Sequence, residues 1–317
     1  MMIADFQLAM DSIVGEGRSL HSVLGDWFRD WKQLQAFSES FKNSEPFPHV
    51  IIDGFFSEAF ASSLLDNFPL PHKTNELIEW HKYENPLECK FATNDVNPLP
   101  QELREAIETL QSTEFVHIAE KISDIAPLET DPFLHGGGLH FHPPGGKLNV
   151  HLDYSKHPKL DKERRLNLIV YLNREWRDSF GGHLYLYSSD TNNTPERAEA
   201  KILPVFNRAV LFRTSDISWH GMPNLITCPM DDGRKSIAVY YLSNLRMDAE
   251  TRLKARFVAK DDISLDPGIA EELCKIRSHR LLDAETISKV IPNWISPMRH
   301  YSDLFVNSSS TKDNVNQ

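Results

Sequence analysis

The chain has 317 residues, of which 40% are hydrophobic and 25% are charged, a balance that is ordinary for a folded globular protein. The formal net charge of -11 argues against a general polyanion binder, because phosphate contacts need clustered Lys and Arg side chains and no such cluster is evident. We therefore expect no nucleic-acid partner.

The three cysteines, Cys89, Cys228 and Cys274, are few, odd in number and without a CxxC spacing. This usage predicts a reducing compartment and buried apolar thiols rather than zinc ligands or disulfides. The chain starts without a basic segment followed by an apolar core, and no apolar run approaches the roughly 18 residues of a membrane span. We expect a soluble, cytoplasmic protein with no membrane partner, and the pattern leaves the oligomeric state open.

The N-terminal part of the chain, residues 1–45, is predicted to be a helical extension. Between Leu20 and Phe41 the apolar residues recur at intervals of three and four, which indicates one face of an amphipathic helix. Core packing is the favoured role of this face, and a partner or dimer surface is the alternative.

The main domain, residues 46–245, is predicted to start with a strand over residues 49–53 and a helix that follows Ser57. The stretch from Pro69 to Pro100 is expected to be an irregular loop, in which aromatic side chains pin the loop or contact substrate. Two helices, over residues 102–110 and 115–122, complete the scaffold before the strands begin.

From Leu134 to Leu242 the apolar period changes to two, with turns rich in Gly, Pro, Asn and Asp, and this predicts an antiparallel β domain. The fold class is therefore α+β, with a double-stranded β-helix (jelly roll) core and helices packed around it. A C-terminal helical extension, residues 246–317, is expected to contain helices over 268–276 and 284–290 and a disordered tail of about ten residues. The predicted strands span residues 138–142, 148–151, 166–172, 183–187, 201–204, 209–212 and 236–242.

The tripeptide His151-Leu152-Asp153 is the candidate metal-binding motif of the chain. Side chains at positions i and i+2 of a strand point to the same face, so one imidazole and one carboxylate lie together. A third ligand is expected from His220, just beyond the strand over residues 209–212. Two histidines and one carboxylate leave three open octahedral positions, the arrangement typical of non-haem Fe(II) oxygenases.

The ordered set of His151-x-Asp153, the Gly181-Gly182 turn, His220 and Arg234 at the start of the last strand resembles the Fe(II)/2-oxoglutarate dioxygenase superfamily, in particular its prolyl-4-hydroxylase-like branch. The resemblance covers about residues 46–242 and is strongest from residue 135 onward. It implies a hydroxylase that needs Fe(II), O2 and 2-oxoglutarate as cosubstrate, and it leaves room for ascorbate as a reductant.

The resemblance also implies that Arg234 pairs with the distal carboxylate of 2-oxoglutarate, because the family has an Arg or Lys at this position. Lys235 is the competing residue, but strand neighbours face opposite ways and Arg234 is favoured. Tyr171 matches a family tyrosine whose hydroxyl contacts the cosubstrate, with plain packing as the alternative. His135, His140 and His142 could form another metal site, but polar hydrogen bonding is their expected role; His142 lies on the strand that flanks the cosubstrate in the family, and His183 has no ligand partner at a useful spacing.

The substrate class is not defined by these motifs, because substrate recognition resides in loops. The favoured substrate is a peptidyl or free amino acid, and the first alternative is oxidative tailoring of another small molecule. A zinc hydrolase or a non-catalytic jelly-roll binding protein would also fit the three ligands, whereas the carboxylate of Asp153 argues against a halogenase.

Overall fold

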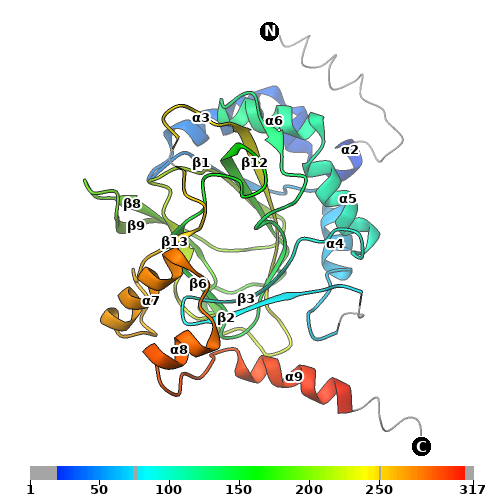
Figure 1. Ribbon diagram of the computed structural model, residues 1–317. Coiled ribbons are helices and arrows are strands. Elements are labelled where there is room, and N and C mark those ends of the chain that lie inside the picture. Colours follow the sequence, from blue (N-terminus) through cyan, green and yellow to red (C-terminus); the bar gives the residue numbers. More distant parts are fainter. Residues whose placement is uncertain (1–19, 74–76, 250, 311–317) are drawn as a thin grey trace, which may run out of the picture.

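The computed structural model describes residues 20–73, 77–249 and 251–310 (Figure 1). Within these residues no helix combines the length and the apolar composition that crossing a bilayer requires. The helices are α2 (Leu20–Val23), η1 (Asp26–Arg29), α3 (Trp31–Asn43), α4 (Glu58–Asp66), α5 (Gln101–Leu110), α6 (Thr113–Ser123), η2 (Asp178–Phe180), α7 (Pro267–His279), α8 (Ala284–Val290) and α9 (Arg299–Ser310).

The strands form one curled antiparallel sheet in the order β1-β10-β7-β12-β5-β3-β6-β11-β8-β9, with β2 beside β3, β4 beside β12 and β13 beside β6. This is the predicted α+β jelly-roll architecture. The strands are β1 (His49–Asp53), β2 (His81–Asn85), β3 (Glu88–Thr93), β4 (Glu129–Thr130), β5 (Gly138–His142), β6 (Lys147–Leu152), β7 (Lys162–Tyr171), β8 (Leu184–Ser189), β9 (Pro195–Ile202), β10 (Arg208–Arg213), β11 (His220–Met222), β12 (Arg234–Asn244) and β13 (Arg256–Phe257).

The two faces of β7 show how the sheet divides core from site. Leu166, Leu168 and Val170 face outward into the main hydrophobic core, which the helices α3 to α6 cover on one side of the sheet (Figure 1). Asn167 and Tyr171 face the other way and are also buried, at 2% and 0% exposure. Polar side chains therefore gather on the concave face, as the alternation of a strand requires.

The prediction of one continuous N-terminal helix is wrong, because α2, η1 and α3 replace it. Gly25 interrupts the helix where it approaches the loop after β1: a Cβ at this position would lie 2.0 Å from the carbonyl oxygen of Gly54. Asp30 then accepts a hydrogen bond from the backbone N–H of Lys32 and begins α3. The apolar face does pack into the core, with Trp27 and Phe28 buried.

The prediction of an irregular loop between Pro69 and Pro100 is also wrong, because β2 and β3 form a hairpin there and β3 joins the main sheet between β5 and β6. Asn85 accepts hydrogen bonds from the backbone N–H groups of Leu87 and Glu88 in the tight connection. Polar side chains hide the strand pattern, since one face of β3 turns toward the concave side of the sheet.

The C-terminal part adds to the sheet and to its lower edge. β13 pairs with β6, and α7 and α8 lie beside it, with α9 below the hairpin of β2 and β3 (Figure 1). Lys147 and Asp262 form an ion pair of 2.7 Å whose side chains are 2% and 0% exposed, and this pair fixes the segment after β13 against β6. The helix α9 continues to Ser310, further than the expected start of a disordered tail, and the rest of that tail lies outside the described residues.

Candidate active site

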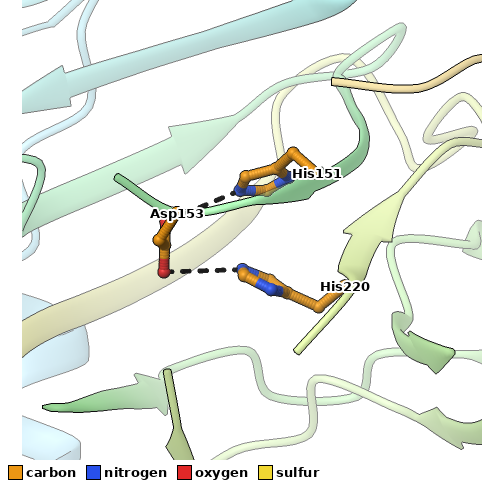
Figure 2. A group of neighbouring side chains, drawn as sticks. All are labelled: His151, Asp153 and His220. Carbon is orange, nitrogen blue, oxygen red and sulfur yellow. Dashed lines mark ion pairs between the residues drawn. The ribbon is translucent and has the colours of Figure 1, made fainter. Parts of the chain in front are cut away.

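The three predicted metal ligands lie together at the junction of β6 and β11. In the register of these strands His220 is the direct partner of His151, and Asp153 follows two residues after His151. All three residues are buried, and their ligand atoms lie within 4.8 Å of one another. Figure 2 shows the two rings and the carboxylate pointing toward a common centre. His220 lies in the short strand β11 rather than beyond a strand end, and the strand fixes its position.

Both imidazoles are oriented by their own backbone. Nδ1 of His151 lies 2.9 Å from the carbonyl oxygen of Asn149, and Nδ1 of His220 lies 2.9 Å from that of Ser218. A carbonyl oxygen only accepts, so each Nδ1 carries the proton and each Nε2 keeps its lone pair. The Nε2 atoms lie 3.7 and 3.8 Å from the two carboxylate oxygens of Asp153, beyond hydrogen-bond distance. The lone pairs are therefore available to a metal ion.

The charges of the site suit a cation. Burial alone would raise the pKa of Asp153, but His151, His220 and Arg164 outweigh it and hold that pKa below its usual range. Burial, together with the neighbouring His151, lowers the pKa of His220 to about 4. At neutral pH the triad thus offers a carboxylate and a neutral imidazole at His220, the protonation states that metal binding requires.

Arg164 supports Asp153 from β7. Its Nη1 lies 3.7 Å from Oδ1 of Asp153, and its guanidinium stacks between two tyrosine rings, 3.4 Å from the centroid of Tyr154 and 3.3 Å from that of Tyr240. A β-bulge in β7 places Arg164 on this face. Consecutive residues of β12, Tyr241 and Leu242, pair with Leu166 and Arg164, so that Arg165 has no partner in the ladder. Bulges of this kind re-aim side chains. Without the bulge Arg164 would point into the outer core.

Two aromatic rings wall the histidines off from water. Phe257 of β13 stacks on His151 with ring centroids 5.1 Å apart, and Phe212 of β10 contacts His220 at 4.8 Å. Both phenylalanines are buried. These contacts fix the ring planes and lower the local dielectric constant around the ligand atoms.

Arg234 occupies the same concave face at the start of β12. Its Nε donates to the carbonyl oxygen of Gly182 at 2.9 Å, and its Nη2 donates to the hydroxyl of Tyr171 at 3.1 Å. The predicted glycine turn brings this carbonyl close, since a Cβ on Gly182 would lie 3.3 Å from Cδ of Arg234. Lys235 points elsewhere and donates to Asp232 at 2.6 Å.

His142 lies opposite Arg234 in the pairing of β5 with β12. It is 2% exposed, and neither of its ring nitrogens has a hydrogen-bond partner among the described residues. Burial and the positive charge of Arg234 lower the pKa of His142 well below its ordinary value, so the ring is neutral. A buried imidazole with two free nitrogens, beside a guanidinium, is the kind of polar group that a bound ligand satisfies.

Residues 137–242 match the family model described as the 2OG-Fe(II) oxygenase superfamily. These residues belong to that superfamily. The matched segment runs from β5 to β12, and it contains the triad, the glycine turn, Tyr171 and Arg234.

Two curated relatives are similar to a larger part of the chain. The chain is 25% identical over 240 residues to Prolyl 3-hydroxylase OGFOD1 of Xenopus laevis, and this match covers 74% of the chain and 42% of the relative. It is 24% identical over 193 residues to Prolyl 3-hydroxylase OGFOD1 of Mus musculus, and this match covers 58% of the chain and 31% of the relative. The chain thus spans less than half the length of either relative.

A similar solved structure is a prolyl hydroxylase from Trichoplax adhaerens in complex with a hypoxia-inducible factor oxygen degradation domain peptide fragment. The match has a TM-score of 0.47 and 20% sequence identity, and it covers 68% of the chain and 94% of that structure.

The residues of the oxygenase domain fit Fe(II) and 2-oxoglutarate. The site suits a metal ion because the Nε2 lone pairs of His151 and His220 and the ionised carboxylate of Asp153 converge. Both Nδ1 protons of the histidines are donated to backbone carbonyls, which keeps the Nε2 atoms free. The cosubstrate fit rests on Arg234, which is 5% exposed and has no carboxylate partner among the described residues. A buried guanidinium without an anion is costly, so a dicarboxylate beside it is stabilised.

Several residues of the site were not predicted from the sequence. Arg164 was missed because a bulge inverts its strand face, and Phe257 was missed because a two-residue strand has no detectable period. The remaining histidines have local partners: His183 pairs with Asp178 at 2.9 Å, and His140 engages the backbone of Gly136 and Gly137, with its Nε2 unpartnered within the part of the chain that the structure describes. The carbonyl oxygen of His135 accepts a hydrogen bond from Arg164 at 2.6 Å.

Proposed function

We propose that this chain is an Fe(II)- and 2-oxoglutarate-dependent dioxygenase that hydroxylates a peptidyl or free amino acid. The observation that carries the proposal is the convergence of two backbone-oriented Nε2 atoms on the carboxylate of Asp153. Proline is the favoured residue of the substrate, and the names of the curated relatives support this choice. Three buried, free cysteines support a reducing compartment, the cytoplasm.

The proposed roles follow the positions of the side chains. His151, Asp153 and His220 would hold Fe(II), and Arg234 with Tyr171 would bind the distal carboxylate of 2-oxoglutarate. The bound iron and cosubstrate would supply the oxidative chemistry, in which O2 gives one oxygen atom to succinate, formed from 2-oxoglutarate with loss of CO2, and the other to the hydroxyl group of the product. The chain's own contribution is to orient these groups: Arg164 fixes Asp153, and Phe212 and Phe257 exclude water from the ligand atoms.

The direct test measures succinate formation from 2-oxoglutarate with Fe(II), against a panel of proline-containing peptides, free amino acids and other small molecules. We expect metal-dependent succinate formation that one substrate class stimulates. His220→Ala should abolish it, whereas His117→Ala should not, because His117 is an exposed histidine on α6. Succinate formation that survives in His220→Ala would contradict the proposal, and its absence in the wild-type protein with every compound would favour a binding protein.

A further inference from the structure

Lys90 is a cation on the concave face that the proposed reaction does not use. It lies in the middle of β3, between Cys89 and Phe91, which face the hydrophobic core, so its own side chain points to the opposite face. The side chain is 12% exposed. In the sheet, β3 lies between β5, which carries His142, and β6, which carries His151. Lys90 therefore lies between the proposed cosubstrate and metal sites.

The ammonium of Lys90 is poorly satisfied by the protein. Its nearest carboxylate oxygen, Oε2 of Glu88, is 3.9 Å away, beyond hydrogen-bond distance. The other oxygen of Glu88 lies 3.3 Å from Nη2 of Arg277, so one carboxylate serves two cations. The described residues provide no hydrogen-bond acceptor for the ammonium, and its other close contact is the ring of Tyr83, 5.1 Å from the centroid.

Two histidines of β5, His140 and His142, lie beside Lys90 and have ring nitrogens without a hydrogen-bond partner among the described residues. His140 pairs with Ala92 of β3, and its Nε2 is buried without a hydrogen bond. Burial, together with the charges of Lys90 and Arg234, lowers the pKa of His140 to about 3, so this ring is neutral. His142 beside it has two free ring nitrogens. His140 engages the backbone of Gly136 and Gly137, whereas the ring nitrogens of His142 are free, so the neutral His142 can donate an N–H to an oxyanion beside the ammonium.

The charges of the site identify what is missing. The proposed iron takes up the charge of Asp153, and the distal carboxylate of 2-oxoglutarate takes up that of Arg234. The only carboxylate then left near Lys90 among the described residues is Glu88, which also pairs with Arg277. The positive charge of Lys90 is therefore incompletely neutralised in a buried environment, where an unpaired charge is costly. Arg234 starts a strand two positions away in the sheet, about 10 Å across at the usual strand spacing and on the far side of β5, so we assign the two cations to separate anions.

We propose that Lys90 forms a second subsite that binds an anionic oxygen group of the substrate, a carboxylate or a phosphate. This inference rests on the proposed function, because it assumes that the substrate approaches the metal from the side of β3. The subsite would select substrates that carry an acidic group near the hydroxylated position, and Lys90 would determine specificity without taking part in the oxidation.

The test uses the full chain, loaded with Fe(II) under anaerobic conditions and saturated with 2-oxoglutarate. Acetate, inorganic phosphate and neutral acetamide serve as probes, and calorimetry at low ionic strength measures their affinity. The variants are Lys90→Met, which removes the charge, and Lys90→Arg, which keeps it. Lys289→Met is the matched control, because Lys289 is an exposed lysine on α8. Thermal melts establish that each variant folds.

We expect the wild-type protein to bind acetate or phosphate at least about tenfold more tightly than acetamide, an advantage that Lys90→Met loses and Lys90→Arg retains. The affinity for 2-oxoglutarate should stay within about twofold in both variants. Tighter binding of acetate indicates a carboxylate in the substrate, and tighter binding of phosphate indicates a phosphorylated one.

A second arm measures KM and kcat for proline-centred peptides that carry Glu, phosphoserine or Gln at each flanking position. Lys90→Met should raise KM for the preferred acidic peptide and leave kcat nearly unchanged. Equal anion affinity in the wild type and in Lys90→Met would overturn the inference. So would a loss of 2-oxoglutarate affinity in Lys90→Met as large as in Arg234→Met, because Lys90 would then belong to the cosubstrate site. Failure of the proposed function is distinct, since it appears as absent 2-oxoglutarate binding and absent succinate in the wild-type protein.

Discussion

At the residue scale, the metal site depends on backbone carbonyls as much as on its ligands. Each histidine is oriented by the carbonyl two residues before it, Asn149 for His151 and Ser218 for His220. These bonds come from the strand itself, so no side chain has to be recruited to fix the tautomer. Asp153 differs, because its two oxygens depend on side chains of β7: Arg164 at 3.7 Å and Asn167 at 3.3 Å.

The role of Arg164 gives a testable prediction. Arg164→Met should weaken Fe(II) binding about 10- to 100-fold, because the carboxylate of Asp153 loses the charge that orients it. Arg164→Lys should recover part of the affinity, since it keeps the charge without the stacking between two rings. Competition with a chelator measures the affinity. An unchanged affinity in a folded Arg164→Met protein would show that Asp153 needs no such support.

Arg234 gives a second prediction, on the cosubstrate. Arg234→Ala should retain Fe(II) and lose about 2–5 kcal/mol of 2-oxoglutarate binding, roughly thirty- to several-thousand-fold in affinity. Lys235→Ala is the neighbouring control, because Lys235 pairs with Asp232 away from Tyr171. Anaerobic titration of the absorption band of the Fe(II)-cosubstrate complex gives both affinities. A loss in Lys235→Ala alone would contradict the assignment.

At the scale of elements, the segment around β13 completes the wall of the metal site although it lies beyond the residues that match the family model. β13 pairs with β6 and places Phe257 against His151, and the ion pair of Asp262 with Lys147 holds the segment that follows. Asn149 also donates to Asp262, at 2.8 Å. A metal-binding strand and the C-terminal part of the chain are thus linked through one buried carboxylate.

This ion pair predicts a dependence of stability on pH. Burial alone would raise the pKa of Asp262, but Lys147, Ser264 and Asn149 hold it below its ordinary value. A depressed folded pKa stabilises the protein above the ordinary pKa, near pH 4, and this stabilisation is lost as the pH falls through the folded value. Asp262→Asn should cost about 3–5 kcal/mol at pH 7, because it leaves Lys147 buried and unpaired.

Urea unfolding of the wild type and of Asp262→Asn at pH 7 and below pH 4 measures the difference. The gap between the two free energies of unfolding should narrow in acid. Asp303→Asn is the control, as an exposed carboxylate on α9. A gap that stays constant with pH would show that the charge of Asp262 does not stabilise the fold.

The sequence predicted the elements whose pattern is local, and it missed those that depend on distant contacts. The strands β5, β6, β7, β10 and β12 were found because their apolar residues alternate, and His151 with Asp153 followed from that alternation. The hairpin of β2 and β3 was missed because polar side chains such as Lys90 face the concave side of the sheet. The helix break at Gly25 depends on Gly54, a contact that no local pattern shows.

At the scale of the whole molecule, the distribution of charge matters more than its total. The chain carries a formal net charge of -11, yet Arg164, Arg234 and Lys90 lie on the concave face of its sheet. Most acidic side chains lie elsewhere in the chain, while the buried cations favour anionic ligands. The proposed cosubstrate and the proposed substrate group are both anions, in agreement with this distribution.

We propose above all that His151, Asp153 and His220 bind one Fe(II) ion that supports 2-oxoglutarate turnover. The most direct measurement is metal stoichiometry together with the Fe(II)-cosubstrate absorption band, in the wild type and in His151→Ala, Asp153→Ala and His220→Ala. We predict one Fe(II) per chain and a saturable band in the wild type, and the loss of both in each folded variant, with His117→Ala unchanged. A folded triple variant that still binds Fe(II) and produces succinate would contradict the account.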